Sequence, residues 1–193
     1  MKKDIILAGV GGQGILSIAA IIGFGAVESG FQLKQAEVHG MSQRGGDVQS
    51  HLRISDRTIY SDLVPLGSAD LILSVEPMEA LRYKPYLSES GWLVTNIHPF
   101  LNISDYPDME ELMKEIRIVP HHITLDANQI SKELQAPRSM NMVMLGAAAP
   151  FLDIDYRKLQ DGIRFVFGRK GEEIVEMNLR AMAAGKKQAE QEL

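Results

Sequence analysis

Apolar residues in the first part of the chain follow a pattern typical of a strand, a turn and a helix. Lys3–Ala8 is a compact apolar run that ends at glycines, as a buried strand does. Between Gly14 and Gly30 nearly every residue is apolar, which predicts a helix packed deeply against a sheet. Phe31–Val38 has the pattern of a second strand. Together these segments form a βαβ unit, so we expect a parallel sheet with right-handed connections.

The middle of the chain alternates between short apolar segments and turn residues. Val48–Ile54 and Thr58–Asp62 are separated by Ser55–Arg57, a spacing that predicts a hairpin. Further elements are predicted as strands at Asp70–Val75, Gly91–Asn96 and Ile116–Pro120, a helix at Glu76–Leu87, and a polar segment with a short amphipathic piece at Asn102–Glu115.

The last third of the chain has the pattern of helices. Asp126 can cap a helix that runs to about Gln135, and Pro137 marks its end. Three more helices are predicted at Asn141–Leu152, Asp155–Phe167 and Glu172–Ala184, followed by a charged tail, Gly185–Leu193, that we expect to fray. The predicted fold class is α/β: a three-layer, mostly parallel Rossmann-like sheet with an additional hairpin and a helical C-terminal third.

Composition and charge narrow the class of protein. The chain has 193 residues, of which 45% are hydrophobic, enough for one sizeable core, so we expect residues 1–193 to form one domain. The net charge is −5 and no basic run is present, so we expect no nucleic-acid partner. No apolar run reaches the roughly 18 residues that span a bilayer, so we expect no membrane partner. Asp4 interrupts the first apolar run, which indicates a strand of a cytoplasmic protein rather than a signal peptide.

The chain contains no cysteine. It therefore has no disulfide, no cysteine nucleophile, and no thiolate for a zinc site or an iron–sulfur cluster. None of its five histidines pair at the i, i+4 spacing that places two imidazoles on one helix face. We expect no metal site in this chain.

The sequence GVGGQG at residues 9–14 is a first candidate for binding chemistry. Gly9, Gly11 and Gly14 have the G-x-G-x-x-G spacing between a predicted strand and a predicted helix. Such a turn directs backbone N–H groups and a helix N-terminus toward an anion. Glycines also simply permit a tight strand-to-helix turn, and both interpretations stay open.

The sequence around this turn lacks the residues that dinucleotide-binding enzymes and nucleoside triphosphatases require. A dinucleotide-binding enzyme carries an acidic residue about 20 residues further on, at the end of the second strand. Glu28 lies inside the predicted helix, and Glu37 comes late. A triphosphatase needs Lys and Ser or Thr after the turn, where this chain has Ile15 and Leu16.

A second loop is unusually polar. EVHGMSQRGG, from Glu37, packs several donors and two adjacent glycines into one connection, which indicates contact with something outside the domain. Arg44 has the forked donors that suit a carboxylate or phosphate, although a surface ion pair would also explain it. Arg138–Asn141 can line a cleft or begin a helix. We find no G-x-S-x-G elbow and no H-E-x-x-H, and we predict no catalytic residue.

Taken together, these motifs resemble a known family. They are GVGGQG at residues 9–14, EVHGMSQRGG followed by S-x-L-R-I from Ser50, DLILSVEP at Asp70–Pro77, and the stretch Asn141–Gly146. Over nearly its whole length the chain resembles the gamma-type domain of pyruvate and other 2-oxoacid:ferredoxin oxidoreductases. More narrowly, it resembles the small (beta) subunits of indolepyruvate ferredoxin oxidoreductases.

The resemblance implies a division of labour. In this family a large partner subunit carries thiamine diphosphate, Mg²⁺ and the iron–sulfur clusters. The complex oxidatively decarboxylates an aryl 2-oxoacid, transfers the acyl group to coenzyme A as co-substrate, and reduces ferredoxin. This chain lacks cysteine and the G-D-G…N pattern that holds the diphosphate, which fits a subunit that binds no cofactor alone and is not active alone. It would support assembly and the active-site surroundings.

We expect the two glycine motifs to lie together near the carboxyl ends of parallel strands. There they would contact coenzyme A phosphates, complete the active site or dock the large subunit. The candidate binding residues are Gly9, Gly11, Gly12, Gln13, Gly14, His39, Ser42, Gln43, Arg44, Gly45 and Gly46. Two alternatives stay open: a stand-alone nicotinamide- or flavin-dependent oxidoreductase, and a pure interaction module.

Overall fold

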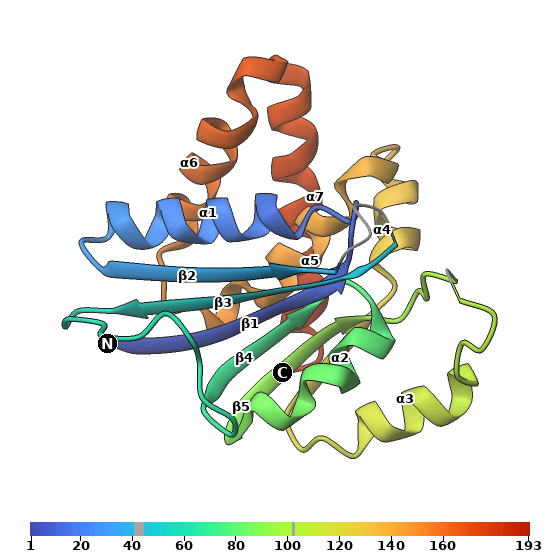
Figure 1. Ribbon diagram of the computed structural model, residues 1–193. Coiled ribbons are helices and arrows are strands. Elements are labelled where there is room, and N and C mark those ends of the chain that lie inside the picture. The colour runs from blue at the N-terminus through green and yellow to red at the C-terminus, as the bar shows by residue number, and fades with distance from the viewer. Residues whose placement is uncertain (41–44, 102) are drawn as a thin grey trace.

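The computed structural model describes residues 1–40, 45–101 and 103–193. In this part of the chain a six-stranded sheet carries helices on both faces (Figure 1). The strands are β1 (Lys2–Val10), β2 (Gln32–His39), β3 (Asp47–Ser55), β4 (Ala69–Ser74), β5 (Leu87–Asn96) and β6 (His122–Leu125). The α-helices are α1 (Ile15–Glu28), α2 (Pro77–Tyr83), α3 (Met109–Arg117), α4 (Ala127–Glu133), α5 (Met140–Ala148), α6 (Tyr156–Phe167) and α7 (Glu172–Glu190). Single 3₁₀ turns are η1 (Lys84–Tyr86), η2 (Pro137–Ser139), η3 (Ala149–Phe151) and η4 (Gly168–Lys170).

The sheet is mixed but mostly parallel, with strand order β2-β3-β1-β4-β5-β6. β1 pairs parallel with β4, β4 with β5, and β5 with β6, whereas β3 is antiparallel to both β1 and β2. From Asp4 to Val10 every residue of β1 is buried, because this strand lies inside the sheet and is covered on both faces. The continuous apolar run Ile5–Ala8 follows from that position. The predicted α/β class with a mostly parallel sheet is confirmed.

The β1–α1–β2 unit is present, but its two strands are not neighbours. β2 runs in the same direction as β1 and lies at the edge of the sheet, with β3 between them. The predicted hairpin of Val48–Ile54 with Thr58–Asp62 is wrong, because residues 58–62 form no strand. β3 instead pairs with the preceding strand β2, from Gln32 opposite Ser55 to His39 opposite Val48. The additional hairpin is therefore the β2–β3 pair.

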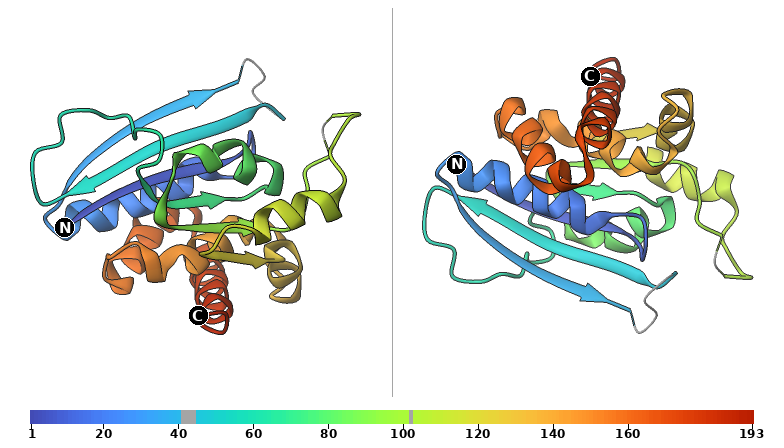
Figure 2. Two further views of the ribbon diagram at one scale, coloured as in Figure 1. Left: turned by 90° about the horizontal axis from the view of Figure 1, so that it is seen from below. Right: turned by 90° about the horizontal axis from the view of Figure 1, so that it is seen from above.

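Two helical layers cover the sheet (Figure 2). α1, α5, α6 and α7 lie on one face, and α2 and α3 lie on the other. α1 is apolar on nearly all sides because it lies between the sheet and α6. A Cβ on Gly162 of α6 would lie 3.0 Å from the backbone oxygen of Ile21, so the two helices approach closely. Outside this contact, the rings of Phe24 and Phe165 stack with centroids 4.9 Å apart.

The predicted helix cap at Asp126 is confirmed, and Asp155 caps the helix predicted to start there. Asp126 accepts a hydrogen bond from the N–H of Gln129 at 2.8 Å and begins α4. Asp155 accepts one from the N–H of Arg157 at 2.8 Å and begins α6. Each carboxylate satisfies an N–H group that has no partner inside the helix.

Two predictions about the later elements are wrong. Ile116–Pro120 is not a strand, because α3 continues to Arg117 with Leu112, Met113 and Ile116 on its buried face, and β6 starts only at His122. The tail from Gly185 is not frayed, because α7 extends to Glu190 and packs on α5. The segment Asn141–Leu152 is buried within the chain by this packing.

Asp4 and Arg53 form an ion pair near the amino-terminal end of β1, the end away from α1. Asp4 is 1% exposed and accepts two bonds from Arg53, at 2.7 Å from Nε and 3.0 Å from Nη2. The same guanidinium donates to the carbonyl oxygens of Ser61 and Leu63, at 3.2 and 3.1 Å. Arg53 therefore ties the segment after β3 to the core. In the described ranges no helix is long and apolar enough to cross a membrane.

Candidate functional site

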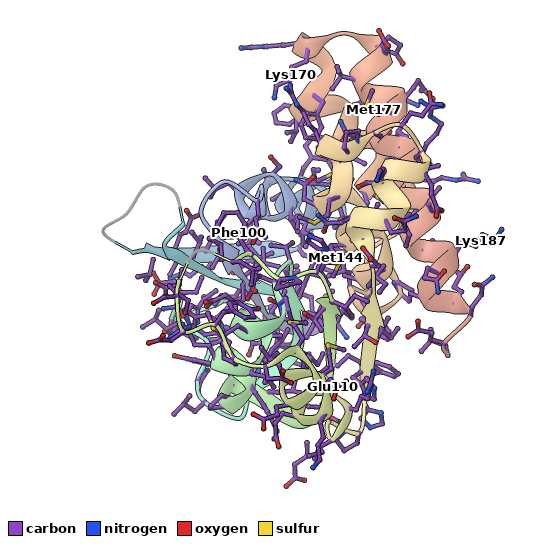
Figure 3. All side chains as sticks on the ribbon, turned by 90° about the vertical axis from the view of Figure 1, so that its right-hand side faces the viewer. Phe100, Glu110, Met144, Lys170, Met177 and Lys187 are labelled. Carbon is purple, nitrogen blue, oxygen red and sulfur yellow. The ribbon has the colours of Figure 1, made fainter. Side chains whose placement is uncertain are left out.

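The carboxyl ends of the parallel strands meet at one edge of the sheet, the side that faces the viewer in Figure 3. At this edge β1 leads into α1 on one face, whereas its neighbour β4 leads into α2 on the other. In open α/β sheets such a divergence leaves a crevice in which ligands bind. The candidate site is therefore the edge between β1 and β4.

The turn after β1 requires glycine for two physical reasons. A Cβ atom on Gly9 would lie 2.3 Å from Cγ2 of Val75, so close packing excludes a side chain. Gly12 and Gly14 have φ angles of 101° and 83°, in the left-handed region that other residues rarely adopt. Gly14 is also the N-cap of α1, so the turn leads directly into the helix N-terminus. Apart from its chain neighbours, no atom of the described residues lies within 4 Å of a Cβ built on Gly12, so this corner of the turn is open with respect to them.

Gln13 closes the turn with its own side chain. Its Oε1 accepts the N–H of Val10 at 2.8 Å, and its backbone N–H donates to the carbonyl oxygen of Val10 at 3.1 Å. Two bonds between the same residues hold the turn in one conformation.

The two glycine motifs are in direct contact. The N–H of Gly11 donates to the carbonyl oxygen of Gly46 at 2.8 Å, and the N–H of Gly45 donates to that of Gly11 at 3.4 Å. Gly45 has a φ of 81°. The structure thus brings Gly11, Gly45 and Gly46 together at the carboxyl edge. That these residues bind a ligand stays a prediction.

Three candidate residues, Ser42, Gln43 and Arg44, lie outside the described residues. The backbone of His39 ends β2, opposite Val48. The described part of the loop closes through the N–H of Gly40, which donates to the carbonyl oxygen of Asp47 at 3.0 Å.

Asn141 is a site residue that sequence reasoning did not single out by itself. Its Nδ2 donates to the carbonyl oxygen of Gly14 at 3.2 Å, across 127 positions of the chain. The sequence signal was limited to the prediction that Arg138–Asn141 can line a cleft, and the structure places three of these four residues in the wall of one.

Two cavities meet at Gly14. A cavity of about 340 Å³ runs over the glycine turn and the first turn of α1, from Val10 to Ser17. A larger one of about 530 Å³ lies between this turn, Ser139 and Asn141, and the helical arm of α6 and α7, which contributes Lys170 and Met177. Figure 3 shows Lys170 and Met177 close together on that arm.

On the other face, a buried carboxylate organises the end of β4. Glu76 is 0% exposed and caps α2 by accepting the N–H of Glu79 at 2.9 Å. It also accepts the N–H of Phe100 at 3.3 Å and the hydroxyl of Tyr106. Burial, together with this bond to a carboxylate, raises the pKa of Tyr106 above its ordinary range. In the sequence, Glu76 followed by Pro77 is a local signal for the start of a helix. No local sequence pattern indicated that Tyr106 contacts Glu76.

A second carboxylate network lies beside α2. Burial raises the pKa of Glu79, although Arg82 bonds it at 2.8 Å and opposes that shift. Tyr83 donates to Oδ2 of Asp47 at 3.1 Å. Burial is the main cause that raises the pKa of the Tyr83 hydroxyl, and the bond to Asp47 raises it further. These groups join the start of β3 to α2. In the described ranges no group of His, Asp and Glu could hold a metal ion.

The chain matches the model of the pyruvate ferredoxin/flavodoxin oxidoreductase family over residues 4–188. It belongs to this family. A similar relative is indolepyruvate oxidoreductase subunit IorB of Pyrococcus horikoshii, 35% identical over 100% of this chain and 99% of that protein. The IorB subunit of Archaeoglobus fulgidus is 32% identical over 98% and 96% of the two chains. The resemblance to small subunits of indolepyruvate oxidoreductases is confirmed.

Two solved structures share the fold. The gamma subunit of keto/oxoacid ferredoxin oxidoreductase from Geobacter sulfurreducens has a TM-score of 0.72 and 23% identity, over 98% of this chain and 99% of that one. The 2-oxoglutarate:ferredoxin oxidoreductase from Magnetococcus marinus, with 2-oxoglutarate, coenzyme A and succinyl-CoA bound, has a TM-score of 0.78 and 24% identity. The likeness covers 98% of this chain and 31% of that longer chain.

Proposed function

We propose that this chain is the non-cofactor subunit of a 2-oxoacid:ferredoxin oxidoreductase of the indolepyruvate type. The similarity to IorB subunits over the full length of both chains carries this proposal. The complex would oxidatively decarboxylate an aryl 2-oxoacid to its acyl-CoA and reduce ferredoxin in the cytoplasm. Residues 1–193 would act in it as one gamma-type domain.

The redox and thiamine chemistry would belong to the large partner subunit. This chain does not fit an iron–sulfur cluster, because it has no cysteine to bind the iron. It also lacks the G-D-G…N pattern for a magnesium-bound diphosphate. The contribution of this chain would therefore be assembly and the surroundings of the active site.

The glycine turns would bind the phosphates of coenzyme A. Three features support this role: the open corner at Gly12, the contact between Gly11 and Gly46, and the N-terminus of α1 directly after Gly14. Backbone N–H groups and the positive end of a helix dipole favour an anion at such a place. The two bonds between Gln13 and Val10 restrain the turn, so little conformational entropy would be lost on binding.

Reconstitution with a partner tests the subunit role. The chain would be produced with and without a thiamine-diphosphate, iron–sulfur subunit from the same genome, and coenzyme-A-dependent dye reduction measured with indolepyruvate, phenylpyruvate and pyruvate. We expect activity only with both chains, and fastest with indolepyruvate. Activity of the large subunit alone would reduce this chain to an interaction module. Saturable dinucleotide binding by the isolated chain would instead favour a stand-alone oxidoreductase.

A matched pair of variants tests the phosphate site. Gly12→Asp adds a carboxylate to the open corner and should raise the KM for coenzyme A by about tenfold or more, because it repels a phosphate. Gly30→Asp is the control, because Gly30 also has a positive φ (79°) and open space around it, but lies at the far end of α1. An equal change in both variants would overturn the phosphate role.

A further inference from the structure

The contact between Asn141 and Gly14 has a consequence for the glycine turn. Asn141 is 8% exposed and lies at the start of α5, a helix whose residues from Asn141 to Ala148 are all buried. Its Nδ2 donates to the carbonyl oxygen of Gly14 at 3.2 Å. A Cβ on Gly14 would lie 2.4 Å from the same nitrogen, so the amide occupies the space that a side chain there would need.

The carbonyl oxygen of Gly14 is held from three directions. Besides Asn141, the N–H groups of Ser17 and Ile18 donate to it at 3.1 and 3.3 Å. In the described part of the chain no side chain caps the N-terminus of α1, and these three donors orient the peptide plane between Gly14 and Ile15. A trans peptide is planar, and its C=O and N–H point in opposite directions. Holding the Gly14 oxygen therefore aims the N–H of Ile15 the other way, out of the helix N-terminus.

We infer that Asn141 is a positioning residue that sets the direction of the Ile15 N–H and thereby the affinity of the turn for a phosphate of coenzyme A. This inference rests on the proposed function for its ligand. Asn141 acts through Gly14, from a helix that packs on α7 and cannot shift freely. Its loss would leave only the two backbone donors on the Gly14 oxygen, so the peptide plane would be held less firmly. Binding would weaken without any change in the chemistry of the partner subunit.

Two variants remove the donor in different ways. Asn141→Asp keeps the shape and adds a charge, whereas Asn141→Leu removes the donor without a charge. Ser131→Ala is the control, because Ser131 is also buried (0% exposed) and its Oγ donates to the carbonyl oxygen of Asn128 at 2.9 Å within α4, but it lines neither cavity at Gly14. Steady-state kinetics of the reconstituted complex and hydrogen exchange of residues 9–17 in the full chain would be measured for each.

We expect both Asn141 variants to raise the KM for coenzyme A by about fivefold or more with kcat changed by less than about twofold. We also expect faster amide exchange in residues 9–17, and neither effect in Ser131→Ala. An effect of Asn141→Asp alone would assign it to charge and overturn the inference, as would unchanged exchange or unchanged KM in both variants. If Gly12→Asp still raises the KM in that case, only the role of Asn141 fails. If Gly12→Asp has no effect either, the phosphate site itself fails.

Discussion

Gly146 and Gly185 let the backbones of α5 and α7 touch. A Cβ on Gly146 would lie 1.9 Å from the carbonyl oxygen of Met182, and one on Gly185 would lie 1.8 Å from that of Val143. No real Cβ tolerates such distances, so the crossing exists only with glycine at both positions. Because α5 carries Asn141 and α7 carries Asn178, this crossing also sets the width of the larger cavity.

Alanine at either glycine should destabilise the protein strongly. Gly146→Ala and Gly185→Ala place a methyl group against backbone atoms that cannot move independently, so we expect a loss of about 3 kcal/mol or more in the free energy of unfolding. Gly168→Ala is the control, because no atom of the described residues outside its own helix and its chain neighbours lies within 4 Å of a Cβ there, and its φ is negative. Urea unfolding monitored by circular dichroism measures all three. A similar small change in all of them would refute the tight crossing.

Removing the charge of Asp4 should also be costly. Asp4→Asn leaves the guanidinium of Arg53 without its carboxylate at a site where the Asp4 side chain is 1% exposed. Breaking a buried pair on one side typically costs about 3–5 kcal/mol. Arg164→Met is the comparison, because Arg164 pairs with Glu172 in solvent, where about 0–1 kcal/mol is expected. Thermal unfolding midpoints would rank the two, and equal midpoints would contradict the structure.

Tyr106→Phe should loosen the segment after β5. The variant removes the hydroxyl donor to the fully buried carboxylate of Glu76, a charge-assisted bond worth about 1.5–3 kcal/mol. Limited proteolysis next to Phe100, whose N–H bonds the same carboxylate, should become faster. Tyr60→Phe, at a side chain that is 91% exposed, should behave like the unaltered protein. Identical cleavage rates for both variants would show that the Tyr106 hydroxyl does not hold the segment.

Glu79 should make stability depend on pH in a defined direction. Because its pKa in the folded protein is raised above the ordinary value of 4.5, the folded state keeps this proton over a range where the unfolded state loses it. Stability therefore falls as pH rises from about 4.5 through the folded pKa. Glu79→Gln removes this dependence and keeps an oxygen for Arg82. The stability of Glu79→Gln relative to the unaltered protein should rise between about pH 4.5 and pH 7. A pH-independent difference would contradict the raised pKa.

The sequence by itself determined the elements whose causes are local. The run Ile5–Ala8 of β1 was predictable as a buried strand because it is continuously apolar, and Asp126 and Asp155 mark helix starts because each caps its own first turn. The turn at residues 9–14 was predictable because positive φ angles at Gly12 and Gly14 require glycine. The absence of cysteine excluded iron–sulfur chemistry without any structure.

Contacts between distant residues decided the rest. β3 lies between β1 and β2 in the sheet. This order could not be predicted, because no local sequence pattern specifies which strands pair. In the sequence Gly185 indicates the end of a helix. In the structure it packs against the backbone of Val143, and α7 continues past it to Glu190. The bond from Asn141 to Gly14 spans 127 positions, and that from Tyr106 to Glu76 spans 30. Hydrogen bonds and close packing of this kind form only when the whole fold brings their partners together, so only the tertiary structure could place them.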